Sequence, residues 1–296
     1  MQIPIRSAAI ALAAALVASA GAQERETRER TIAVSVVSND GTPVDGLTAK
    51  DFVVRENGLA REVVRVAPAS PPSHIALLID DSQATQNTTA FLRPALTAFV
   101  KTVAAADPAP HVALWTFGER PTRRVNFTPN AAAIEQEIPR IIPVTSAGAY
   151  LLEAIGEAVK ELRTRQAERP VIVAFVAERG PEFSTILEKQ ITEAVRTIGA
   201  SLWTVTLEGN GQPLTSTEHR ERARVLGETT SLSGGTNDVI LTPQALESAF
   251  ARIGRALTSR YAVTYGRPDS LIPPDRIDVE VRRPDVQVRA SRWAGQ

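Results

Sequence analysis

Residues 74–258 alternate between short apolar runs and amphipathic segments, and this pattern predicts a parallel sheet covered by helices. Five consecutive apolar residues at 75–79 and six at 171–176 are typical of strands buried on both faces. The apolar residues between 96 and 103 recur with helical spacing, and Pro94 fits the first turn of that helix. We therefore expect an α/β fold with a central, mainly parallel sheet flanked by helices. The other strands are expected at 112–115, 202–205 and 239–241, and the other helices near 134–138, 151–162, 187–198, 218–231 and 246–257.

Both ends of the chain show a different pattern, in which apolar and polar residues alternate with the period of a β-strand. Three short strands with one apolar face are not readily stable on their own. We therefore expect residues 31–67 and 259–293 to pack together as one small β unit. A proline- and serine-rich linker near 68–73 would separate this unit from the α/β domain. The expected strands are 31–36, 52–54, 63–64, 261–265, 277–281 and 286–288.

Residues 1–22 have the layout of a secretory signal peptide. Arg6 precedes an alanine-rich apolar run at 8–20, and Ala20-Gly21-Ala22 provides a cleavage site of small residues. The alternative is an alanine-rich helix buried in the core. We favour the signal peptide, which predicts that the protein is exported and is periplasmic or secreted. No other stretch is long and apolar enough to span a membrane.

Composition excludes several classes of function. The chain has 33 basic and 33 acidic residues, so its charge does not favour binding to nucleic acid. It has no cysteine, which excludes thiol catalysis and cysteine–zinc sites. We also find no glycine-rich phosphate loop and no histidine in a zinc-protease pattern. These observations predict a protein that is not an enzyme and has no cofactor.

The histidines and a cluster of arginines are expected at the surface. His74 and His111 each precede an apolar strand, where a strand-edge position is the simplest interpretation. His219 lies at the start of a polar helix whose arginines alternate with glutamates, a pattern typical of a solvated face. These arginines are Arg220, Arg222 and Arg224.

The strongest candidate for chemistry is the polar run that follows the apolar strand at 75–79. Asp80, Asp81 and Ser82 come directly after this strand, and the carboxyl end of a central strand is where α/β sheets bind ligands. Two interpretations remain open at this point. The side chains either bind a ligand or metal, or they cap the turn by bonding to backbone amides.

The run resembles the D-x-S-x-S motif of von Willebrand factor type A domains, which have a Rossmann-like fold. The chain is similar in particular to the related proteins abundant in Acidobacteria. The resemblance also rests on the leader at 40–58, on Leu152-Glu153-Ala154-Ile155 after Gly148, on Ser233-Gly234-Gly235, on residues 249–265 and on Arg283-Pro284. It implies an interaction module with a site for Mg²⁺ or Mn²⁺ that also binds a carboxylate of the ligand.

The resemblance carries over onto this chain only in part. Asp80 and Ser82 match the metal motif, whereas Ala84 and Ala149 stand where a serine and a threonine are expected, and Glu178 replaces an aspartate. Magnesium requires near-ideal octahedral coordination by oxygen. We therefore predict a degenerate site, formed by Asp80, Ser82 and Glu178, that does not bind metal specifically. The alternative is weak Mg²⁺ or Mn²⁺ binding rescued by a neighbouring oxygen, and the candidates for it are Thr85, Ser146 and Asp81.

The resulting hypothesis is an exported interaction module that binds a protein or a cell-surface polymer. Its binding edge would include Asp81, Gly148 and Arg179 besides the residues of the degenerate site. Two alternatives remain. The chain serves as a structural scaffold with a vestigial site, or it is a hydrolase that uses the acidic cluster.

Overall fold

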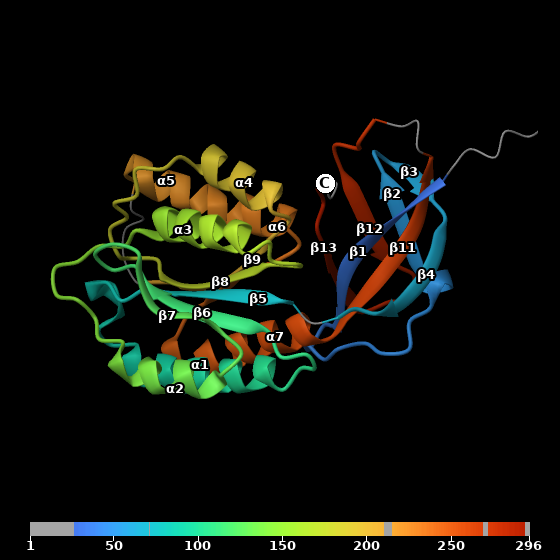
Figure 1. The fold of residues 1–296 in the computed structure, drawn as a ribbon. Coiled ribbons are helices and arrows are strands. Elements are labelled where there is room, and N and C mark those ends of the chain that lie inside the picture. The colour runs from blue at the N-terminus through green and yellow to red at the C-terminus, as the bar shows by residue number, and fades with distance from the viewer. Residues whose placement is uncertain (1–26, 71, 210–214, 269–271, 294–296) are drawn as a thin grey trace, which may run out of the picture.

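The computed structural model describes residues 27–70, 72–209, 215–268 and 272–293. An α/β domain lies beside a smaller part made mainly of β-strands (Figure 1). This arrangement confirms the predicted fold class. The predicted signal peptide lies outside the described residues. Within the described ranges, we find no helix that combines the length and the apolar character needed to cross a membrane.

The central sheet has the strand order β10-β9-β8-β5-β6-β7, and all neighbouring pairs are parallel except β6 and β7. The two predicted apolar runs, β5 and β8, lie side by side in its middle. The antiparallel edge strand β7 was not predicted, because only Val125 and Phe127 of its seven residues are apolar. The strands are β5 (His74–Ile79), β6 (His111–Thr116), β7 (Thr122–Thr128), β8 (Val171–Ala177), β9 (Ser201–Leu207) and β10 (Asn237–Ile240).

Helices cover both faces of this sheet and bury two apolar cores against it. Helices α1, α2 and α7 lie on one face, and α3 to α6 lie on the other (Figure 1). The buried positions of α1 and α3 follow the predicted helical spacing. The helices are α1 (Thr89–Ala104), α2 (Ala131–Glu137), α3 (Leu151–Thr164), α4 (Glu188–Thr197), α5 (Thr217–Arg224), α6 (Thr230–Leu232) and α7 (Leu246–Thr258).

Two predicted helices differ from the structure. Helix α1 begins at Thr89, so Pro94 lies inside it and the prediction that Pro94 occupies the first turn was wrong. Pro94 is exposed, and so is Ala90, whose carbonyl loses the usual amide partner and faces water instead. The helix predicted at 218–231 is divided, because a π-helical turn at Val225–Thr229 separates α5 from α6.

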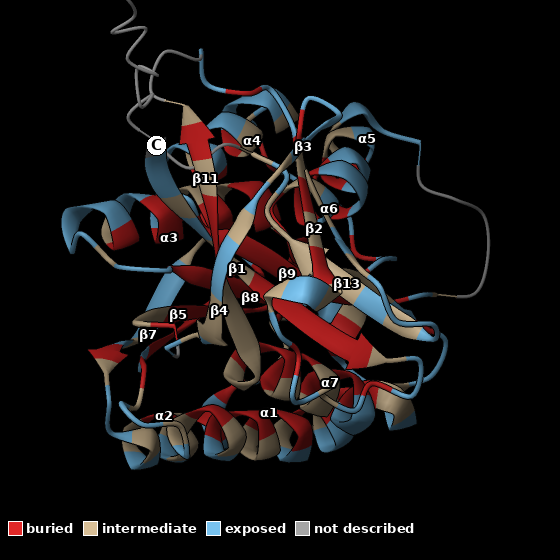
Figure 2. Ribbon diagram, turned by 90° about the vertical axis from the view of Figure 1, so that its right-hand side faces the viewer, coloured by how far each residue is buried: buried red, intermediate tan, exposed pale blue. Residues whose placement is uncertain are grey.

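Strands from both ends of the chain form the β part. One sheet has the order β13-β1-β11-β4 and the other the order β12-β2-β3. Strand β1 pairs with β11 over nine residues, which confirms that the two ends associate. Buried residues of both sheets form a separate core, and buried positions on the strands are red in Figure 2. The strands are β1 (Thr27–Ser38), β2 (Phe52–Glu56), β3 (Leu59–Arg61), β4 (Val63–Pro68), β11 (Arg260–Pro268), β12 (Ile277–Val281) and β13 (Val286–Ala290).

The β part packs at the amino-terminal end of the central strands. The chain passes from β4 into the start of β5 at that end (Figure 1). Arg292 N donates to Leu232 O at 2.9 Å, and the backbone of Ala290 lies so close to Gly234 that a Cβ there would be 2.5 Å from it. The carboxyl ends of β5, β8 and β9 therefore point away from the β part, and the loops at that edge are not covered by it.

Candidate functional site

Asp80 is the first residue after β5 and is completely buried. Its Oδ1 accepts a hydrogen bond from the Ser82 amide at 2.8 Å, and its Oδ2 accepts one from the Ala177 amide at 3.0 Å. Burial raises the pKa of Asp80, against the opposing effect of these bonds. The carboxylate thus caps the turn after β5 and ties it to the end of β8.

Ser82 is also completely buried. Its Oγ makes no hydrogen bond of normal geometry. The hydroxyl nevertheless lies near enough to Asp80 to lower the pKa of that carboxyl. The loop after β8 packs directly against it, since a Cβ added to Gly180 would lie 3.1 Å from Ser82 Oγ and 3.2 Å from Ala84 Cβ. Asp80 and Ser82 therefore meet as predicted, under a loop that closes over them.

Asp81 joins two other loops of the same edge. Its Oδ1 accepts a hydrogen bond from the Gly118 amide at 2.6 Å, and its backbone oxygen accepts one from Val144 N at 2.8 Å. A Cβ at Gly118 would lie 2.7 Å from Asp81, so this contact requires glycine. Burial raises the pKa of Asp81. Asp81 is largely buried, and the bonded carboxylate oxygen serves to join the loops.

The donor set around Asp80 does not fit Mg²⁺. Ala84 and Ala149 present methyl groups where hydroxyls would be needed, and Glu178 has an exposed side chain whereas Asp80 and Ser82 are buried. Of the five side-chain ligands that the resemblance implies, only Asp80 and Ser82 match, and the Asp80 carboxylate already accepts hydrogen bonds from two amides. Among the described residues there is also no group of three or more acidic, histidine or cysteine side chains suited to a metal.

A buried arginine lies beneath the loop after β8. Arg222 of α5 is 1% exposed. Its Nη2 donates to Glu178 O at 2.5 Å and to His219 Nε2 at 2.6 Å. Its Nη1 donates to Gly180 O at 3.3 Å and contacts Glu182 Oε2 at 3.4 Å. One guanidinium therefore bonds two carbonyls, an imidazole and a carboxylate, and the positive charge also acts on Asp80.

Glu182 and His219 complete this arrangement. Glu182 Oε1 accepts hydrogen bonds from the Leu151 amide at 3.0 Å and from Ser184 Oγ, which links the loop to the start of α3. Burial raises the pKa of Glu182 to about 7, although Ser184 and Arg222 favour the charged form. Burial and the nearby Arg222 lower the pKa of His219, whose Nε2 lies 2.6 Å from Arg222 Nη2 and 3.1 Å from Glu178 O.

The prediction of a solvated helix face was wrong for His219 and Arg222. Both are buried, whereas Arg220 and Arg224 are exposed as expected. A signal was present, because His219 and Arg222 share the helical stripe of buried Leu226 at spacings of three and four residues. The charged residues concealed it, since arginine is rarely buried without a partner.

Gly148 and Arg179 shape the outer surface of the edge. A Cβ at Gly148 would lie 2.4 Å from the ring of Phe183, so glycine allows this ring to lie across the loop. The Phe183 ring also contacts Tyr150, with 5.9 Å between the ring centroids. Arg179 is exposed, and its aliphatic part lies over Gly209. Gly148 is thus a packing position, and Arg179 remains available at the surface.

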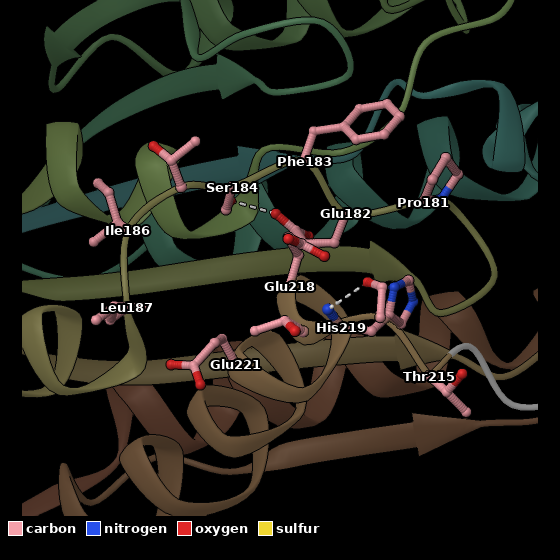
Figure 3. A pocket seen from close by; sticks show the side chains of 13 residues that line it. Pro181, Glu182, Phe183, Ser184, Ile186, Leu187, Thr215, Glu218, His219 and Glu221 are labelled. Carbon is pink, nitrogen blue, oxygen red and sulfur yellow. Dashed lines mark hydrogen bonds between the residues drawn. The ribbon is translucent and has the colours of Figure 1, made fainter.

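A pocket of about 650 Å³ opens beside these residues, between the β8–α4 loop and the start of α5 (Figure 3). Sequence analysis did not predict it, because its two walls are separated by some thirty residues and meet only in the fold. Its lining consists of Pro181, Glu182, Phe183, Ser184, Thr185, Ile186, Leu187, Thr215, Ser216, Thr217, Glu218, His219 and Glu221.

Residues 75–178, which include β5, the Asp80 turn and β8, match the family model of the von Willebrand factor type A domain. The chain contains a von Willebrand factor type A domain. The match ends at Glu178, so the VWA family model does not cover the pocket or Arg222. None of the curated proteins compared with the chain matches it.

Solved structures share the VWA fold at low identity. A D319A mutant of the PilB minor pilin from Streptococcus sanguinis is 12% identical with a TM-score of 0.50, and the match covers 64% of this chain and 62% of the pilin. A von Willebrand factor type A protein from Catenulispora acidiphila is 11% identical with a TM-score of 0.48, and the match covers 91% of this chain and 75% of that one. These likenesses concern the fold alone.

Proposed function

We propose that this protein is an exported interaction module that binds another protein through the carboxyl edge of its VWA domain, without a metal ion. The observation that carries the proposal is the buried guanidinium of Arg222, which holds the loop after β8 by two of its carbonyls. The buried charge of Arg222 supports the loop after β8 electrostatically. The oxygen donors around Asp80 are too few for Mg²⁺.

Exposed apolar side chains at this edge also support the proposal. Phe183 and Leu187 are 49% and 54% exposed on the loop after β8, and Leu241 directly after β10 is 74% exposed. Ile142 is 66% exposed, on the loop whose Val144 amide donates a hydrogen bond to the backbone oxygen of Asp81. Loops at the end of a rigid sheet often carry binding residues, and exposed apolar side chains on such loops favour contact with another protein. The buried Asp80 and Asp81 carboxylates bond backbone amides, so we propose no hydrolytic role for them.

A scaffold function is the second candidate, and the β part gives one reason for it. Leu59 of β3 and Val64 of β4 are 65% and 49% exposed on strands at the edges of their sheets. Exposed apolar residues on an edge strand favour pairing with another chain. The two candidates therefore place the partner at opposite ends of the molecule.

Site-specific photo-crosslinking in the cells that make the protein distinguishes the two candidates. A photoreactive amino acid replaces Phe183 in one variant and Leu59 in the other, and irradiation is carried out with and without EDTA. We expect a discrete protein adduct from position 183, in the exported fraction, that persists in EDTA. Adducts from position 59 alone would support the scaffold instead, and an adduct at 183 that disappears in EDTA would contradict a metal-independent edge.

A further inference from the structure

The pocket beside the Asp80 turn combines an apolar wall with an acidic wall. Phe183, Ile186 and Leu187 of the β8–α4 loop form the apolar side, and the first turns of α5 form the other (Figure 3). Its volume of about 650 Å³ lies in the range of roughly 300–1,000 Å³ typical of ligand pockets. The cavity is therefore large enough for a short stretch of a partner chain.

Every charged residue that lines the pocket is acidic: Glu182, Glu218 and Glu221. Glu182 is already paired with Arg222 beneath the floor. Glu221 also has partners within the protein. One of its carboxylate oxygens pairs with Arg224 at 3.1 Å, and the other accepts a hydrogen bond from the Glu188 amide at 2.8 Å. These two carboxylates are thus largely satisfied from within the protein.

Glu218 is different, because its carboxylate has no ion pair with a described residue. Hydrogen bonds from its own amide and from Ser216 lower its pKa, so it is charged at neutral pH. The charge of Arg220 on the same helix also lowers the pKa of Glu218, but the guanidinium donates to Thr215 O and to Thr217 Oγ1, both at 3.1 Å. Glu218 therefore lines the pocket with a negative charge that no described residue neutralises by a direct ion pair.

We propose that this pocket receives a segment of the partner protein in which a large apolar side chain is followed by a lysine or arginine. The apolar side chain enters against the apolar side chains of the β8–α4 loop, and the cation pairs with Glu218. The resemblance to metal-binding VWA domains implied a ligand that carries a carboxylate. The acidic groups of this pocket would repel such a ligand. The inference rests on the proposed function and specifies the chemistry of the partner.

Fluorescence anisotropy with synthetic peptides tests the pocket directly, using the whole chain in EDTA. Three labelled peptides of equal length are compared: one with alternating leucine and lysine, one with glutamate in place of lysine, and one with glycine in place of leucine. We expect the leucine–lysine peptide to bind at least about tenfold more tightly than either of the others, which corresponds to about 1.4 kcal/mol.

Variants then assign the binding to the pocket. Glu218→Lys is expected to abolish the preference for lysine over glutamate, and Phe183→Ser to weaken all apolar peptides. Glu247→Lys is the control, because Glu247 likewise lies in the first turn of a helix, is exposed and does not line the pocket, and this change should leave binding unchanged. Thermal melts confirm that each variant is folded.

Equal binding of the three peptides, no binding by any of them, or an unchanged preference in Glu218→Lys would each overturn the inference. If the photo-crosslink at position 183 still forms in those cases, the edge remains the interaction site and only the assigned partner chemistry is wrong. If the crosslink is also absent, the proposed function itself fails.

Discussion

Replacing Arg222 by methionine is expected to lower the free energy of unfolding by about 3–5 kcal/mol. Methionine has a similar length, so little volume is lost, but the carbonyls of Glu178 and Gly180 lose their donor and Glu182 loses its cation inside the protein. Breaking a buried ion pair by removing one partner is costly, because the remaining carboxyl either stays charged away from water or must take up a proton. Urea denaturation followed by circular dichroism measures the change.

Arg224→Met is the control for this experiment. Arg224 lies on the same helix and pairs with Glu221, but its side chain is 57% exposed. A surface ion pair of this kind contributes about 0–1 kcal/mol. A loss of less than about 1 kcal/mol in Arg222→Met, similar to that of the control, would show that the guanidinium does not support the edge.

Replacing Asp80 by alanine is expected to destabilise the protein by about 2–5 kcal/mol, and by the same amount in EDTA and in Mg²⁺. The buried amides of Ser82 and Ala177 both lose their acceptor, and each unsatisfied group costs about 1–3 kcal/mol. Asp80→Asn should lose about half as much, because the amide side chain retains one acceptor oxygen.

The dependence on metal separates a turn cap from a metal ligand. If Asp80 caps the turn, the difference between wild type and Asp80→Ala is independent of divalent ions. If Asp80 were instead a metal ligand, the two proteins would have similar stability in EDTA and differ only in Mg²⁺. Chemical denaturation of the three proteins under both conditions provides the measurement.

The sequence predicted the fold where burial leaves a strong local pattern. The uninterrupted apolar runs of β5 and β8 are unambiguous because both faces of these strands are covered. The association of the two ends of the chain followed from the weakness of three isolated short strands. Strand β7 was missed because an edge strand with few apolar residues carries little of this signal.

The candidate site was predictable only where its residues follow a strand. Asp80 and Ser82 were found from their position after β5, and the structure places them together. Arg222 was missed because its partners Glu178, Gly180 and Glu182 are some forty residues away along the chain. Its burial depends on those tertiary contacts, and no local pattern records them. Sequence analysis likewise selected Glu178 as the acidic residue of the third loop, whereas Glu182 is the buried carboxylate on which the charge of Asp80 acts.

A thermal melt of residues 23–296 in EDTA and then in Mg²⁺, Mn²⁺ and Ca²⁺ tests the central claim most directly. A metal that binds only the folded protein at 100 times its dissociation constant would add about 2.7 kcal/mol and raise the midpoint by several degrees. We predict the same midpoint in all four conditions, because Ala84 and Ala149 leave the site around Asp80 without the hydroxyls that a metal would need. A saturable increase with one of the metals, lost in Asp80→Ala and in Ser82→Ala, would contradict the account.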